Sequence, residues 1–123
     1  MRKEIEHWWM QAKRDLVTAS NCLNSNDYYA CAFFAQQAVE KGLKAVYLES
    51  HQLWKIHDLV KLAREIKAPS EIILKCSQIN PVYTDVRYPE ADELPSEKVT
   101  KKDGEEILKL AREVLLWIEK RLL

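Results

Sequence analysis

All four prolines of this chain lie between positions 69 and 95, and this grouping constrains the fold more than any other feature. Proline has no backbone N–H and interrupts a helix, so helix is expected to be broken within this stretch, whereas the sequence on both sides has helical spacing. Its most unusual part, residues 83–89 (Tyr-Thr-Asp-Val-Arg-Tyr-Pro), combines two tyrosines, a carboxylate and a guanidinium. A long irregular segment inside a small domain is often functional, so candidate site residues are expected here.

Apolar residues recur every three or four positions on both sides of residues 83–89, which is the period of a helix. The second expected helix, Tyr28–Ser50, is apolar on two sides and should therefore lie at the centre of the fold. The last is expected to begin near Asp103, where Asp103-x-x-Glu106 resembles a capping box. We predict an all-α fold, a single domain over residues 1–123. It should be an antiparallel up-and-down bundle of four to five helices with a proline-containing loop before the last one. The expected helices are Lys3–Leu23, Tyr28–Ser50, His57–Lys67, Glu71–Ile79 and Asp103–Leu122.

Charge and composition argue against several classes of protein. The chain has 19 basic and 19 acidic side chains, whereas a tight nucleic-acid binder normally carries an excess of Lys and Arg. No apolar run approaches the roughly 18 residues of a membrane span, and the first residues do not resemble a signal peptide, so we expect a cytoplasmic protein. Three cysteines and three histidines show no metal-ligand spacing. No metal site and no cofactor are predicted, and the cysteines are expected to be buried thiols.

A polar sector interrupts the apolar second helix at Gln37, Glu40, Lys41 and Lys44. The two lysines are candidates for binding an anionic ligand or for lining a dimer interface. The alternative is a solvated face, on which Glu40 and Lys44 form an i,i+4 pair that contributes little energy. We expect this solvated role for Glu40 and keep Lys41 and Lys44 as candidate ligand-binding residues.

His57 and Asp58 adjoin at the expected start of the third helix. A histidine next to a carboxylate could act as a general base, so His57 is a weak catalytic candidate. Asp58 at a helix start more often caps the helix and complements its dipole. The capping role is the favoured interpretation.

Four side chains of the 83–89 stretch could recognise a ligand. Arg87 could hold a phosphate or carboxylate by two hydrogen bonds. Tyr83 and Tyr88 could stack on a base or donate a hydroxyl, and Asp85 lies between them in sequence. In the alternative, Tyr88 packs on the bundle and Arg87 pairs internally with Asp85 or Glu90. Both interpretations remain open at this point.

Several blocks of the sequence resemble the HEPN domain family over about residues 4–120. The most specific are the central-helix block Ala-Gln-Gln-Ala-Val-Glu-Lys-Gly-Leu-Lys-Ala at 35–45 and the block Tyr-x-x-x-Arg-Tyr-Pro at 83–89. Others are Trp8 with Ala12, Asp15-Leu16 and Ala19, then Tyr28-Tyr29-Ala30 and His57-Asp58-Leu59. The resemblance implies a bundle of four or five helices, usually a homodimer. Many small prokaryotic members act with a minimal nucleotidyltransferase, often as toxin and antitoxin. Some are metal-independent ribonucleases, and others are described as binding nucleotides.

The chain departs from the ribonuclease members at one point. Those enzymes share an R-x4-6-H motif late in the domain, but no histidine follows His57 here, and Arg2-x4-His7 lies at the wrong end. We therefore expect a non-catalytic dimer that binds a nucleotide, a minimal nucleotidyltransferase partner, or both. One alternative is a metal-independent endoribonuclease toxin acting on RNA through Arg87, with Tyr83, Tyr88 or His57 in unusual roles. Another is a dimeric scaffold with no ligand.

Overall fold

The computed structural model describes residues 1–85 and 94–122, with Thr84 and Asp85 described by their backbone alone. No strand occurs in these ranges, so the predicted all-α fold is confirmed. Five helices have seven or more residues and form the predicted bundle, and two more are single turns. No helix of the described part combines the length and the apolar character of a membrane span. The helices are α1 (Lys3–Asn24), α2 (Tyr28–Tyr47), α3 (Leu59–Glu65), α4 (Ser70–Ile79), α5 (Val82–Asp85), α6 (Pro95–Lys98) and α7 (Lys101–Leu122).

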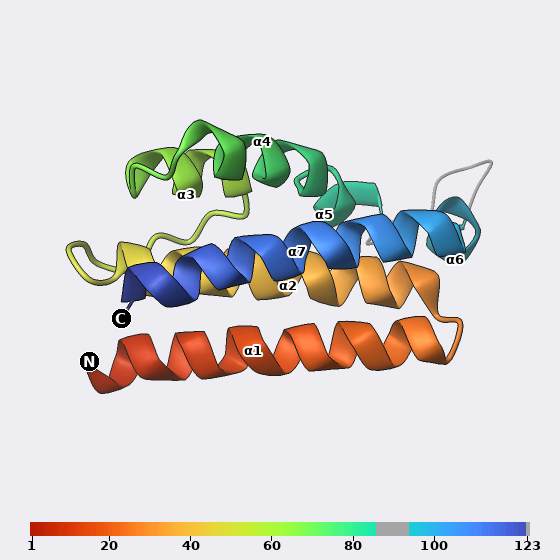
Figure 1. Cartoon of the computed structure of the whole chain (residues 1–123), viewed down its shortest axis with the longest axis horizontal. Helices are drawn as coiled ribbons and strands as arrows, with labels where there is room; N and C mark the ends of the chain where they lie inside the picture. The colour runs from red at the N-terminus through yellow and green to blue at the C-terminus, as the bar shows by residue number, and fades with distance from the viewer. Residues whose placement is uncertain (86–93, 123) are drawn as a thin grey trace.

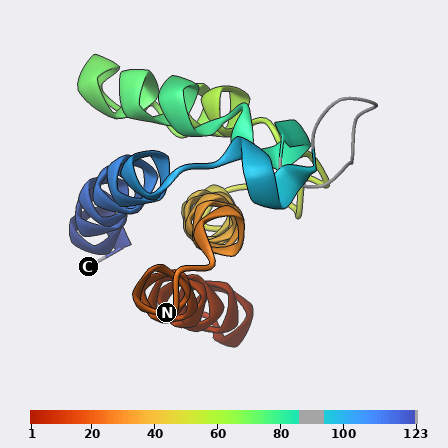
Figure 2. The ribbon, with the colours of Figure 1, turned by 90° about the vertical axis from the view of Figure 1, so that its right-hand side faces the viewer.

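Helix α2 is the centre of the bundle. Seen from its end, α2 is surrounded by α1, by α7 and by the layer that α3 and α4 form (Figure 2). Helices α1 and α2 run antiparallel, and both chain termini lie at the same end of the molecule (Figure 1). This central position explains why α2 is apolar on two sides, because a helix covered from several directions must bury more than one face. Its fully buried side chains include Cys31, Ala35, Ala38, Val39 and Leu43.

Gly42 lies where α2 packs tightly against both α7 and α1. A Cβ atom added there would lie 2.9 Å from Ile118 Cδ1 on α7 and 3.6 Å from the Trp9 ring on α1. Trp9 is buried, whereas its neighbour Trp8 is half-buried. The two tryptophans thus face different surroundings, as residues about 100° apart on a helix must.

Two helices begin at positions set by capping side chains. Asp58 accepts hydrogen bonds from the backbone N–H groups of Val60 and Lys61, so α3 begins at Leu59 and His57 precedes it. This confirms the capping role of Asp58. The expected start of α7 at Asp103 is wrong, because Thr100 and Asp103 form the capping box. Thr100 N–H donates to Asp103 Oδ2 at 3.0 Å, and Asp103 N–H donates to Thr100 Oγ1 at 3.2 Å.

Two of the four prolines lie at the start of short helices. Pro81 directly precedes the one-turn helix α5, and Pro95 is the first residue of α6. Proline is tolerated in the first turn of a helix because the N–H it lacks would have no intrahelical partner there. The segment around residues 83–89 that was expected to be irregular therefore begins within a one-turn helix, α5, which carries Tyr83.

Candidate functional site

Three polar side chains of α2 are buried in the bundle. Gln36 is fully buried, and Glu40 and Lys44 are each only 4% exposed. The expectation that Glu40 lies on a solvated face is therefore wrong. Charged side chains are almost never this buried unless they are paired. The partners of Glu40 therefore explain how its charge is accommodated inside the bundle.

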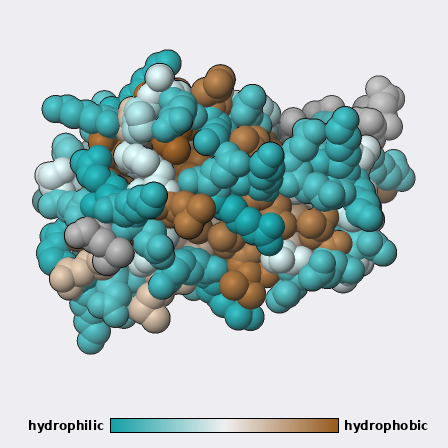
Figure 3. Space-filling model, in the orientation of Figure 1, coloured by the Kyte–Doolittle hydropathy of each residue, from teal (hydrophilic) through white to brown (hydrophobic). Residues whose placement is uncertain are grey.

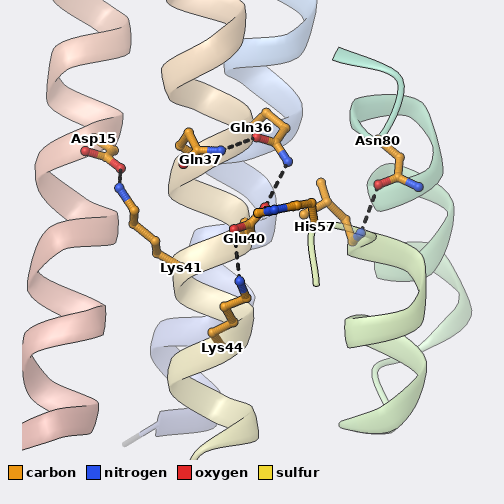
Figure 4. Close-up of polar contacts among 9 residues, drawn as sticks. Asp15, Gln36, Gln37, Glu40, Lys41, Lys44, His57 and Asn80 are labelled. Atoms are coloured by element: carbon orange, nitrogen blue, oxygen red, sulfur yellow. Dashed lines mark hydrogen bonds and ion pairs between the residues drawn. The ribbon is translucent and has the colours of Figure 1, made fainter. Parts of the chain in front are cut away.

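The Glu40 carboxylate is the centre of a hydrogen-bonded cluster (Figure 4). Lys44 Nζ donates to Glu40 Oε2 at 3.0 Å, which confirms the i,i+4 pair. His57 Nδ1 lies 3.1 Å from Glu40 Oε1, and Gln36 Nε2 lies 3.4 Å from the same oxygen. Gln37 Nε2 in turn donates to Gln36 Oε1 at 2.8 Å. Among the described residues, no buried side-chain nitrogen or oxygen lacks a partner.

Trp8 of α1 closes the cluster on one side. Lys44 Nζ lies 5.7 Å from the centre of a Trp8 ring, within the range of a cation–π contact. The lysine is thus enclosed between a carboxylate and an aromatic face, and it is nearly inaccessible to solvent.

His57 forms the exposed end of the cluster. Its side chain is 51% exposed, although Nδ1 contacts the buried carboxylate of Glu40. Its ring stacks on that of Tyr83, with 4.3 Å between ring centres and 15° between the planes. A pair of nearly parallel aromatic rings therefore lies at the surface, next to the Glu40–Lys44 ion pair.

Hydrogen bonds between the start of α3 and the end of α4 position the rings of His57 and Tyr83. Asn80 Nδ2 donates to Asp58 Oδ1 at 3.1 Å, and Leu59 N–H donates to Asn80 Oδ1 at 2.8 Å. His57 directly precedes Asp58, and Tyr83 follows Asn80 by three residues. The Asp58–Asn80 pair thus connects the start of α3 to the end of α4, which brings the two aromatic residues together.

The structure brings together three of the residues expected from the sequence, namely Lys44, His57 and Tyr83. Lys41 instead points toward α1, where it forms an ion pair with Asp15 at 2.5 Å (Figure 4). The side chain of Asp85, and Arg87 and Tyr88 entirely, lie outside the described residues. Within the described part of the chain, no group of three His, Cys, Asp or Glu side chains is arranged to hold a metal ion.

Comparison with known proteins places the chain in a family. The HEPN domain family matches residues 5–121, almost the whole chain. The chain belongs to the HEPN domain family. A Methanocaldococcus jannaschii protein named "Putative toxin MJ1304" is 32% identical over 120 residues, which cover 85% of this chain and 79% of that protein.

Solved structures agree with this assignment. TT1696 from Thermus thermophilus superimposes with a TM-score of 0.90 at 26% identity, covering 98% of this chain and 99% of that one. ST0689, an archaeal HEPN homologue, gives a TM-score of 0.84 at 26% identity over the full length of both chains. A HEPN domain protein from Thermotoga maritima gives 0.75 at 23% identity, covering 94% and 97% of the two chains. The last comparison shows the shared fold alone.

Proposed function

We propose that this HEPN protein is a non-catalytic cytoplasmic dimer that binds a nucleotide at the His57–Tyr83 pair. It would act with a minimal nucleotidyltransferase partner in a module of the toxin–antitoxin kind. The observation that carries the nucleotide proposal is the half-exposed His57 ring, which is stacked on Tyr83 and held by the buried Glu40.

The chemistry of this pair fits a nucleotide. Stacking of a base on an aromatic side chain contributes roughly 1–3 kcal/mol and is available to any base. The ring of Tyr83 is supported on one side by His57, which Glu40 holds at Nδ1, so less conformational freedom is lost when a base stacks on it. A single fixed platform suits a mononucleotide, and the zero net charge of the chain does not oppose so small a ligand.

Equilibrium dialysis tests the binding proposal. The four common ribonucleoside 5′-monophosphates would be dialysed against the wild type, Tyr83→Ala and the control Tyr29→Ala. Tyr29 is exposed in the first turn of α2. We expect saturable binding of at least one nucleotide that Tyr83→Ala weakens and Tyr29→Ala leaves unchanged. Absence of binding by all four nucleotides at millimolar concentration would overturn the proposal.

One observation favours a second function, metal-independent cleavage of RNA. A half-exposed histidine held by a buried carboxylate is a suitable arrangement for a general acid or base, and a similar protein has a name that refers to a toxin. This function predicts cleavage of RNA in EDTA that is lost in His57→Ala and in Arg87→Ala. RNA that stays intact at high protein concentration would exclude it.

The dimer proposal is supported by an apolar hollow between α1 and α7. Its volume is about 300 Å³, and apolar side chains gather in the middle of this face (Figure 3). Leu116, one of the residues that line it, is 61% exposed, and Lys13, Arg112 and Glu119 line it as well. Charges of both signs around an apolar centre suit contact with a second copy of the same surface.

Light scattering tests the dimer and its location. We expect the mass of two chains for the wild type and of one chain for Leu116→Glu, which places a charge in the apolar hollow. The control is Leu74→Glu, because Leu74 is 60% exposed on α4, away from this hollow. A wild-type monomer would exclude the homodimer, and a dimer that persists in Leu116→Glu would exclude this surface.

Co-purification with a nucleotidyltransferase encoded by a neighbouring gene would test the partner.

A further inference from the structure

We propose that Glu40 is a positioning residue that fixes the tautomer of His57, so that Nε2 is presented to the phosphate group of the bound ligand. This inference rests on the proposed nucleotide site and specifies which part of the nucleotide His57 recognises. Tyr83 would support the base, and His57 would bind the phosphate.

The first step concerns the hydrogen on His57. An ionised carboxylate only accepts hydrogen bonds, and Glu40 is paired with the Lys44 ammonium group at 3.0 Å. The contact of 3.1 Å between His57 Nδ1 and Glu40 Oε1 therefore requires that Nδ1 carry a hydrogen. A carboxylate that holds one ring nitrogen in this way determines the role of the other nitrogen. Nε2 then remains for a ligand.

The second step concerns direction. The stacked ring of Tyr83 fixes the plane of His57, and Glu40 fixes the rotation of the ring within that plane. No hydrogen bond to Nε2 is found among the described residues, and half of the His57 side chain is open to solvent. Two constraints on one small ring leave Nε2 in a defined position.

The third step concerns charge. Lys44 from α2 already balances the charge of Glu40, so a proton taken up at Nε2 would add a positive charge that Glu40 does not neutralise. Asp58, next in sequence, faces the N–H groups at the start of α3, which partly balance its charge. Tyr83 contributes a phenol ring from α5. With these described neighbours, an imidazolium favours an anion, and a phosphate oxygen can accept from its Nε2–H.

Nuclear magnetic resonance of the ligand-free protein tests the positioning role. The ¹⁵N shifts of the neutral His57 ring should show hydrogen on Nδ1 in the wild type. Glu40→Gln should lose this strict preference, because an amide can either donate or accept. The Nε2–H tautomer in the wild type would overturn the inference. An unchanged tautomer in a folded Glu40→Gln would overturn it too, whether or not a nucleotide binds.

Calorimetry tests the ligand. Each nucleoside 5′-monophosphate would be compared with its nucleoside on the wild type and on His57→Asn, whose amide keeps a donor near the position of Nδ1 but has no Nε2. The control is His51→Asn, because His51 is exposed and stacks on Tyr47, outside the cluster. We expect the wild type and the control to favour the monophosphate about tenfold or more, as a charge-assisted hydrogen bond would, and His57→Asn to lose this preference.

The outcomes separate the two proposals. Equal binding of nucleosides and monophosphates by the wild type would overturn the phosphate role of His57 and leave the nucleotide site standing. A full preference for monophosphates in a folded His57→Asn would do the same. Binding of neither class of ligand would overturn the proposed function together with this inference.

Discussion

The buried Glu40 carboxylate contacts a histidine whose ring lies at the surface and stacks on Tyr83. Removing an ion pair from water costs several kcal/mol for each ion, and the attraction between the partners restores this only when the geometry is good. Such pairs are therefore weak evidence of stability, although they can hold one arrangement of side chains. In this protein Glu40 contacts Lys44 through one carboxylate oxygen and His57 through the other. The ion pair therefore fixes Glu40, and Glu40 in turn holds His57 in its stacked position on Tyr83.

Lys44→Met should destabilise the fold strongly, because the Glu40 carboxylate would lose its ammonium partner inside the bundle. We expect the free energy of unfolding to fall by about 3–5 kcal/mol, as measured by urea denaturation. The double variant Glu40→Gln/Lys44→Met should recover most of this loss.

The matched control for this prediction is Lys75→Met. Lys75 forms an ion pair of the same length, 3.0 Å, with Glu113, but the two side chains are 27% and 35% exposed. Pairs in contact with solvent contribute about 0–1 kcal/mol. Equal losses in Lys44→Met and Lys75→Met would contradict the description of Glu40 and Lys44 as a buried pair.

At the scale of the helices, the two glycines should respond to alanine in opposite directions. Glycine in a helix costs roughly 0.5–1 kcal/mol relative to alanine. A Cβ atom at Gly104 would meet Leu23 Cδ1 at an ordinary 3.5 Å, so Gly104→Ala should stabilise α7 by about that amount. At Gly42 the added atom would lie 2.9 Å from Ile118, which is fully buried, and overpacking costs about 1–3 kcal/mol.

Thermal unfolding of both variants checks this prediction. The midpoint should rise for Gly104→Ala and fall for Gly42→Ala. A rise in both would show that Ile118 can move aside, and that α2, α1 and α7 are less closely packed at Gly42 than the structure indicates.

The helices could largely be predicted from the sequence, whereas the site could be predicted only in part. Apolar spacing is local information, so the central position of α2 follows from its two apolar faces. The spacing of Glu40 and Lys44 is the same in a solvated pair and in a buried pair, and the tertiary contacts decide between the two. The sequence does suggest His57 and Tyr83 separately. Their stacking depends on the contact between Asp58 and Asn80, which local patterns do not reveal.

At the scale of the whole molecule, burial of two thiols should make the fold less stable at high pH. Burial raises the pKa of Cys31 from 9.0 to about 11 and that of Cys76 from 9.0 to about 12. Well below pH 9.0 both the folded and the unfolded chain keep these protons, so the two thiols leave stability unchanged. Above it the unfolded chain releases them first, so the free energy of unfolding falls as pH rises toward the folded values.

Urea denaturation from about pH 8 to about pH 10.5 checks this slope, because the range begins near the ordinary pKa of a thiol and extends well above it. The control is Cys31→Ala/Cys76→Ala, in which the other titrating groups are the same. The double variant should lose stability with pH less steeply than the wild type. Parallel slopes would contradict the assigned burial of the two thiols.

The central claim is that a nucleotide binds at the His57–Tyr83 pair, and a chemical-shift titration tests it most directly. The protein labelled with ¹⁵N would be titrated with each of the four ribonucleoside 5′-monophosphates. The structure predicts saturable shifts at His57, Tyr83 and the neighbouring backbone of α3 and α5 for at least one of them. Shifts confined to the α1–α7 hollow, or a spectrum unchanged at millimolar nucleotide, would contradict the claim.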